Sequence, residues 1–483
     1  MHRIPLLLIM VILTSMISLP AASQTTEKAI EIKNKMWNKS DADFAVTEIP
    51  DKWKDKSAVI IARHFERSYY KQPIMAFINY YSHRHERVKI LSKSALDDYS
   101  EFTVPTNTTL GGDIFKFYAG FKLIKPDGTE REIPLSDGVK EERKVNNFTF
   151  DNIKLAIPNL EVGDIIDYYI AEERTMVITG GYHSFDPFIF QLSSKYPISY
   201  QKISFDISRR CFLNIKSLNG APEFKKVQEE EKDFYTLIDR DREDVDDLRW
   251  FYENRQLPTI KYKVTYASPG IERANILFLG QQREKKTSVT TQEIKNLSKQ
   301  LSTGYLPAFI KAFRKKHKGE TDRIKIAQDL FYTLRNDYRI EKTALVASSG
   351  EAQNQTVRDS WFTFTMSRCL KYLDISHEVL IGIPRTISDL DDLILENELV
   401  FMIKITQDKD YYLGAFDNYA TFGSFSYLME GTRVYRANGL ITPSLWQLKQ
   451  TEIPVSSFDD NLSVTKTSLS LNTADAELTS SIT

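Results

Sequence analysis

The stretch that decides the fold class is residues 115–129, which read FKFYAGFKLIKPDGT. Phe115 to Leu123 is rich in aromatic residues, as strands often are. In the turn that follows, Pro126 fixes its own φ near the value that a turn requires, and Gly128 accepts a positive φ. We therefore expect a strand that ends in a tight turn.

Similar short segments, rich in β-branched and aromatic residues, continue on both sides for roughly 200 residues. They are Ala58–Ala62, Val88–Leu91, Asp164–Ile170, Tyr200–Ile207, Phe212–Ile215, Phe234–Ile238 and Lys261–Tyr266. Repeated short strands without a long helical pattern are typical of a β-sandwich. The sequence therefore predicts an antiparallel β-sandwich over residues 46–270.

Residues 1–23 differ from the rest of the chain. Arg3 gives a short basic region, residues 5–20 are mostly apolar, and residues 21–23 have the small side chains of a cleavage site. This pattern predicts a secretory signal peptide that is cut before Gln24. The apolar run is shorter than the roughly 20 residues that span a bilayer, so we expect no membrane span after cleavage. We expect export to the periplasm, the cell surface or the medium.

Apolar residues recur at helical spacing in other parts of the chain. Residues 24–45 are predicted to form an N-terminal helical arm, and Ile324–Leu334 and Asp359–Leu373 are predicted helices. Strand patterns follow at 378–383, 398–405 and 411–416, so residues 271–450 are expected to form an α+β domain. Residues 451–483 alternate again and predict a hairpin that begins a further, incomplete β domain. The whole is a multidomain α+β chain.

Composition excludes several classes of function. The 64 basic and 65 acidic side chains give a net charge of −1, which provides no field that would attract nucleic acid. The two cysteines, Cys211 and Cys369, form no CxxC pair, so neither a zinc ribbon nor a redox motif is expected. The sequence gives no reason to expect a cofactor.

Three ordered motifs resemble a bacterial domain of unknown function that precedes transglutaminase-like domains in exported proteins. They are Lys125–Gly128 after a strand, then Leu155–Leu160, then Val162–Tyr168. Farther along, Ile326–Tyr338 looks like the helix before the active-site loop of a transglutaminase-like, papain-related core, and Arg368–Ile375 resembles the end of its nucleophile helix. The resemblance implies a β-sandwich followed by a cysteine-enzyme fold.

In that family a cysteine at the start of the central helix, a histidine on a following strand and an aspartate on the next strand form the catalytic triad. Counting back from Leu373 places the cysteine position at Asp359, and the other two positions fall on Glu398 and Gly414. All three positions have lost the chemistry that Cys-His catalysis needs. The resemblance therefore supports the fold and argues against the activity.

Other nucleophiles are possible but have simpler interpretations. Cys369 precedes His377 by eight residues, but it lies on the apolar face of its predicted helix, where a thiol behaves as a small hydrophobe. Ser360 could replace the nucleophile if the register shifts by one residue, yet Glu398 would be a poor base near neutral pH. Asp359 and Glu398 could face each other and share a proton or a cation, although Asp359 also suits a helix N-cap.

Three further groups of residues are candidate binding sites. His83 and His85 would project from one face of a strand, but no third metal ligand is evident, so we expect exposed strand-end histidines. Asp239–Asp247 is acidic but lacks the glycine and glutamate of a calcium loop, so we expect a solvated loop. Trp250–Tyr252, together with Tyr80 and Tyr81, could stack on a sugar or a peptide, although packing explains them as well.

Two functional hypotheses remain from the sequence. The first is a noncatalytic binding or assembly module at the cell envelope, with an envelope protein, peptide or glycan as its partner. The second is a hydrolase or acyl transferase that acts on peptides or peptidoglycan-like material. Because the triad positions are degenerate, we favour the first.

Overall fold

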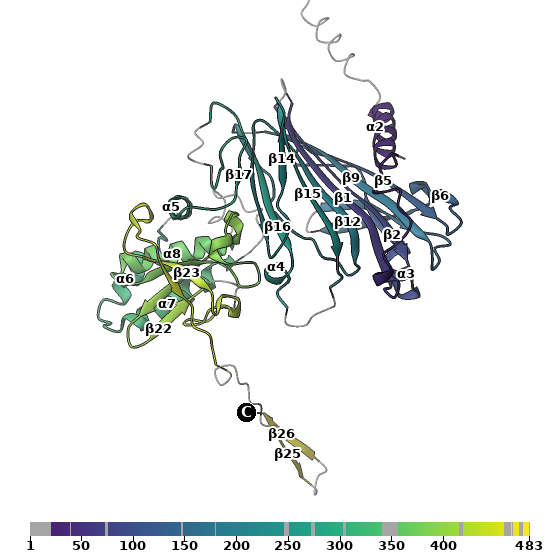
Figure 1. Ribbon diagram of the computed structural model, residues 1–483. Coiled ribbons are helices and arrows are strands. Elements are labelled where there is room, and N and C mark those ends of the chain that lie inside the picture. The colour runs from purple at the N-terminus through teal and green to yellow at the C-terminus, as the bar shows by residue number, and fades with distance from the viewer. Residues whose placement is uncertain are drawn as a thin grey trace, which may run out of the picture. The chain divides into compact units, whose positions relative to one another are not determined.

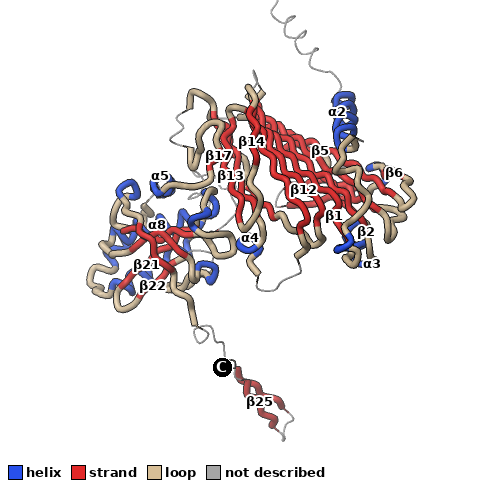
Figure 2. Tube along the Cα trace, in the orientation of Figure 1, coloured by secondary structure: helices blue, strands red, loops and turns tan. Residues whose placement is uncertain are grey.

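A computed structural model describes residues 21–482 except 39, 73–75, 146–147, 179, 246–250, 272–275, 303–305, 341–355, 415–418, 458–464, 466 and 473–476. The predicted signal peptide thus lies almost wholly outside the described residues. The chain divides into two compact units, Met1–Ser288 and Val289–Thr483. Strands dominate the first unit, whereas the second combines helices with a smaller sheet (Figure 2).

A nine-stranded sheet forms the centre of the first unit (Figure 1). Its strand order is β14-β15-β12-β1-β2-β9-β5-β4, and β6 pairs with β5 beside β4. The bounds are β1 Ala58–Lys71, β2 Phe77–Ile90, β4 Thr108–Leu110, β5 Asp113–Ile124, β6 Glu130–Ile133, β9 Ile165–Val177, β12 Ile198–Ser208, β14 Lys225–Gln228 and β15 Lys232–Arg242. The turn between β5 and β6 is the predicted one, with Gly128 at φ 85° and its amide 2.9 Å from the carbonyl of Lys125.

The prediction of a wholly antiparallel fold is wrong for one central pair. Strand β1 pairs with β12 in parallel, with Ile60 opposite Ile198 and Tyr69 opposite Ile207. A parallel pair requires a long connection between its strands, and here more than 120 residues separate Lys71 from Ile198. Alternating apolar residues predict that a strand exists but carry no information about its direction.

A five-stranded sheet completes the sandwich. It comprises β10 Tyr182–Ser184, β11 Phe188–Gln191, β13 Cys211–Leu218, β16 Thr259–Ala267 and β17 Lys285–Lys286, with short helix α4 (Glu253–Gln256) before β16. Phe205 and Tyr235 of the large sheet share one core with Leu213 and Tyr262 of the smaller sheet. Because β17 pairs with β13, the first unit extends to residue 288, beyond the predicted boundary at 270.

A short helix and a further small sheet cover the other end of the same face of the large sheet. They are helix α3 (Lys93–Tyr99) and a three-stranded sheet of β3 Glu101–Pro105, β7 Val139–Val145 and β8 Phe148–Ala156. Val104 and Leu155 pack there against Phe121 and Ile166 of the large sheet.

Helix α2 (Ala21–Met36) lies on the opposite face of the large sheet. Its Ile32 and Met36 are buried against Tyr118, Tyr169 and Ala171. The predicted helical arm is therefore present, and its apolar stripe is what attaches it to the sheet.

The second unit begins with helices and ends with strands, as the sequence pattern indicates. Helices α5 Thr291–Leu301, α6 Ile310–Lys316, α7 Arg323–Asp337 and α8 Asp359–Tyr372 accompany the strand pair β18 Arg339–Ile340 and β19 Thr356–Val357. The antiparallel sheet has the order β22-β21-β20-β23-β24, with bounds β20 Glu378–Gly382, β21 Val400–Thr406, β22 Asp410–Leu413, β23 Arg433–Asn438 and β24 Lys449–Glu452. Leu330, Phe331 and Met366 form its core with Ile403.

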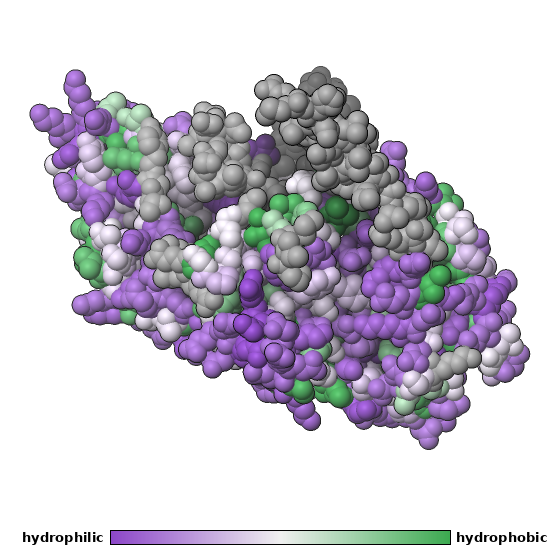
Figure 3. All heavy atoms as spheres, turned by 90° about the horizontal axis from the view of Figure 1, so that it is seen from above, coloured by the Kyte–Doolittle hydropathy of each residue, from purple (hydrophilic) through white to green (hydrophobic). Residues whose placement is uncertain are grey.

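The chain's last described strands are β25 Thr467–Asn472 and β26 Glu477–Ile482, which form the predicted hairpin. Among the described residues, no helix is both long and apolar enough to cross a membrane. On the face seen in Figure 3, polar side chains predominate and hydrophobic ones form small separate groups.

Candidate functional site

The three residues that the sequence resemblance singles out, Asp359, Glu398 and Gly414, lie at the start of α8 and next to strands β21 and β22. Asp359 is the first residue of α8 and therefore follows the N-cap, which is Arg358; the prediction of Asp359 as the N-cap is wrong by one residue. Its Oδ1 accepts a hydrogen bond of 2.6 Å from the amide of Ser360. A carboxylate here is stabilised by the helix dipole, so Asp359 has a structural role that needs no catalysis.

Glu398 is buried, with 2% of its surface exposed, and ends a short 3-10 helix, Glu396–Glu398. Its Oε2 accepts a hydrogen bond of 3.3 Å from the amide of Leu395. The carboxylate therefore closes a turn before β21. Gly414 is buried directly after β22 and carries no functional side chain.

The first turns of α8 lie beside the start of β21. The Thr363 hydroxyl donates a 3.1 Å hydrogen bond to the carbonyl of Phe401, and the rings of Phe364 and Phe401 are 5.1 Å apart. These contacts place the first half of α8 against the beginning of β21.

Neither cysteine is available as a nucleophile. Cys369 is 0% exposed in the core of the second unit, where the helical spacing predicts it, and Cys211 is 3% exposed in the core of the first. Burial raises the pKa of each thiol to about 12. Because the thiolate is the reactive form, both thiols are inert near neutral pH.

The structure joins His377 to Ser367, a partner that the sequence did not suggest. Ser367 Oγ and His377 Nε2 are 2.7 Å apart, and His377 Nδ1 is 2.9 Å from the carbonyl of Ile375. Burial lowers the pKa of His377, so the ring is neutral. This arrangement has the hydrogen bonds of a serine and a base held by a third group.

Two features make this pair structural. Ser367 lies in the middle of α8, where backbone amides are used within the helix and cannot form an oxyanion hole. Gly439 packs so tightly on the ring that an added Cβ would lie 2.1 Å from His377 Nε2. Ser367 does border a cavity of about 720 Å³, which Arg368, Tyr372 and Trp446 also line.

The two histidines of β2 are buried, so the expectation of exposed strand-end residues is wrong. His83 and His85 are each 3% exposed, because helix α2 and the segment that follows it cover this face of the sheet. His85 Nε2 is 2.8 Å from Asp167 Oδ1, and its ring stacks on Phe44 at 3.7 Å. His83 instead lies beside His64 and Glu66 of β1.

The acidic run is also more ordered than predicted. Residues 239–242 belong to β15, and Asp239 accepts a 2.6 Å hydrogen bond from the Gln201 side chain. Glu243 accepts one of 2.8 Å from the Trp53 indole, and Asp244 forms an ion pair of 2.7 Å with Lys56. These carboxylates attach the segment before β1 to the sheet, whereas Asp246 and Asp247 lie outside the described residues.

Tyr80 and Tyr81 do not contribute to one stacking surface. Tyr80 and Tyr81 are adjacent in β2 and therefore point to opposite faces of the sheet. Tyr80 packs near Tyr69 and Phe185 in the sandwich core, while Tyr81 lies near His83. Trp250 lies outside the described residues.

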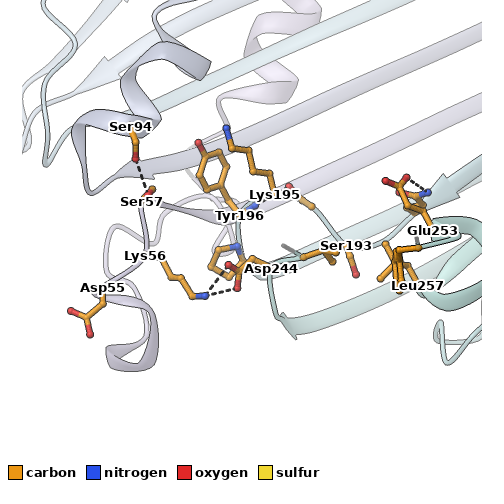
Figure 4. A pocket seen from close by; sticks show the side chains of 15 residues that line it. Asp55, Lys56, Ser57, Ser94, Ser193, Lys195, Tyr196, Asp244, Glu253 and Leu257 are labelled. Atoms are coloured by element: carbon orange, nitrogen blue, oxygen red, sulfur yellow. Dashed lines mark hydrogen bonds and ion pairs between the residues drawn. The ribbon is translucent and has the colours of Figure 1, made fainter. Parts of the chain in front are cut away.

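A polar cavity of about 710 Å³ lies in the first unit, between the segment before β1 and the connection from β11 to β12 (Figure 4). Serines, charged groups and two aromatic rings line it: Lys56, Ser57, Ser94, Gln191, Ser193, Ser194, Lys195, Tyr196, Asp244, Phe251 and Glu253. Tyr196 and Lys195 both bond Asp98, at 2.7 and 2.6 Å. The serine hydroxyls and charged side chains suit a polar ligand better than an apolar one.

The comparisons bear on the fold alone. No family model matches the chain, and no curated protein matches it. A crystal structure described as that of "a putative protease" from Parabacteroides distasonis is similar at 14% identity and a TM-score of 0.53, over 83% of this chain and 72% of that one. An M1 zinc metallopeptidase from Deinococcus radiodurans, at 7% identity and a TM-score of 0.20 over 44% of this chain and 42% of that one, is too distant to support an argument.

Proposed function

We propose that this chain is an exported, noncatalytic transglutaminase-like protein that binds a peptide, a glycan or an envelope protein. The observation that carries the proposal is Asp359 at the first position of α8, where the resemblance calls for the nucleophile. The burial of both thiols supports it further, since no other cysteine exists in the sequence. The polar cavity of the first unit offers a binding site that needs no triad.

Thiol reactivity tests the noncatalytic part of the proposal. We expect native protein to react slowly with a maleimide at neutral pH and unfolded protein to react quickly at both cysteines, because burial raises each thiol pKa to about 12. Peptide mapping assigns the label. Rapid labelling of Cys369 in the native protein, with Cys211 as the internal control, would contradict the proposal.

Ligand binding tests the role of the cavity. A thermal-shift screen of peptidoglycan fragments, envelope polysaccharides and peptides is expected to give a ligand that raises the Tm. Ser193 lines the cavity, so Ser193→Trp should fill it and abolish the shift. Ser136→Trp places the same ring on an exposed 3-10 helix and serves as the control. An equal shift in both variants would place binding elsewhere.

The alternative is a hydrolase or acyl transferase, and one contact favours it. The Ser367 and His377 side chains are 2.7 Å apart next to a cavity. A fluorophosphonate probe labels activated serines, so we expect no label on wild-type protein and none that depends on Ser367. Stoichiometric labelling that Ser367→Ala removes would establish the enzyme in place of the binding module.

A further inference from the structure

Three side chains gather on the face of the large sheet that α2 covers. His64 and Glu66 are two residues apart on β1 and so project from the same side of the strand. Glu66 is directly opposite His83 of β2 in the antiparallel register. One ligand atom from each of His64, Glu66 and His83 lies within 4.8 Å of the others.

Two polar atoms at this place are buried without a partner among the described residues. They are Nδ1 of His83 and the hydroxyl of Tyr81, whose rings are 5.8 Å apart. Such atoms are rare in folded proteins and indicate a missing water, ion or ligand. His85, two residues along the same strand, is equally buried but is bonded to Asp167. On the side of β2 that faces α2, the unsatisfied atoms thus lie at His83 and Tyr81, and others occur elsewhere in the described residues.

We propose that His64, Glu66 and His83 form a binding site for a divalent first-row transition metal, with zinc as the best match. Two imidazole nitrogens and one carboxylate oxygen are a ligand set that zinc accepts, and three protein ligands leave one coordination position open. Ser204 Oγ lies 3.2 Å from His64 Nε2 and orients that ring, as outer partners of metal-bound histidines do.

The ligand types select the kind of metal, whereas the lysines nearby oppose any cation and make weakly held hard cations the least suited. Lys35 of α2 lies 2.7 Å from Glu66 Oε1, and Lys202 of β12 adds positive charge near both histidines. This environment disfavours calcium and magnesium, which depend on an excess of carboxylates, whereas imidazole coordination favours zinc and its neighbours. The side chain of Lys35 is 49% exposed, so it can move into solvent when a metal takes its place beside Glu66.

Isothermal titration of the untagged chain with zinc tests the proposal. We expect one zinc ion per chain, and we expect His64→Ala and His83→Ala to weaken binding by at least about 100-fold, since even outer-shell changes cost 10- to 100-fold. His183→Ala, in the same unit but on β10, is the matched control and should bind as the wild type does. Cobalt binding, followed by its visible absorption, should show the same dependence.

If the histidine variants do not fold, two milder variants test the proposed zinc site instead. Glu66→Gln keeps the shape of a partly exposed side chain and should weaken zinc binding by at least about tenfold. Lys35→Met frees Glu66 from its ion pair and should strengthen binding by up to about fivefold, the range for one partly exposed pair. Equal zinc affinity in the wild type and both variants, or a folded wild type that retains no zinc, would overturn the proposal.

Discussion

Single buried charges hold the middle of the large sheet together. Glu86 is 0% exposed, lies 2.8 Å from Arg84 Nη2 and accepts a 2.5 Å hydrogen bond from the Tyr168 hydroxyl. Burial opposes its ionisation, but Arg84 and Arg63 outweigh burial and hold its pKa below the usual value. Arg63 is itself bonded to Gln201 at 2.5 Å. This polar group lies between the two apolar cores on one face of the sheet.

Glu86→Gln is expected to lower the free energy of unfolding by about 3 to 5 kcal/mol, because it leaves the buried Arg63 without its nearby counter-charge. Because the folded pKa is lowered, this stabilisation is present above the unfolded pKa of about 4.3 and is lost as the pH falls through the folded value. Urea unfolding between pH 3 and 7 measures it. Glu141→Gln, on an exposed position of β7, should change nothing; equal losses in both would refute the assignment.

At the scale of elements, α2 is attached to the sheet by aromatic packing over a glycine. Gly120 of β5 is opposite Tyr169 of β9, and an added Cβ at this glycine would lie 2.5 Å from the Tyr169 ring. The Tyr169 ring meets Trp37 edge-on at 5.3 Å. The glycine therefore makes room for the ring that holds the helical arm.

Gly120→Val is expected to displace the Tyr169 ring and destabilise the first unit by about 1 to 3 kcal/mol, the usual cost of overpacking. Amide exchange in α2 should accelerate more than exchange in β12, because the helix loses its contact. Gly270→Ala has open space around its Cβ and is the control. Unchanged exchange in α2 would show that Tyr169 does not hold the helix.

At the scale of the whole molecule, the division into two compact units implies two separate cores. Leu237 belongs to the core of the first unit and Leu330 to that of the second, and both are 0% exposed. Each core is formed by a separate set of helices and strands, so we expect each unit to unfold cooperatively by itself.

We expect calorimetry to resolve two transitions. Leu330→Ala should lower the transition temperature of the second unit alone, and Leu237→Ala that of the first unit alone. Each substitution should reduce the free energy of unfolding of its own unit by about 2 to 5 kcal/mol. The two variants serve as controls for each other. One transition that both variants shift equally would show that the units unfold together.

The sequence by itself indicated many of the strands, the main helices of the second unit and their order, because hydrophobic periodicity and turn residues act locally. It also placed Asp359 at the start of its helix, by counting from the helix end. Periodicity could not reveal that β12 lies parallel to β1, nor that long strands continue through charged residues such as Arg63 and Glu66.

Only the tertiary structure decided which polar residues meet. His83 looked like an exposed residue without a third ligand because Glu66 and His64 lie on another strand, and the register between β1 and β2 brings them together. Ser367 and His377 also meet only in the folded chain, because helix α8 packs against the segment that follows it. Contacts across strands depend on the register of the strands and on the elements that cover each face of the sheet. The local pattern of residues predicts neither of these.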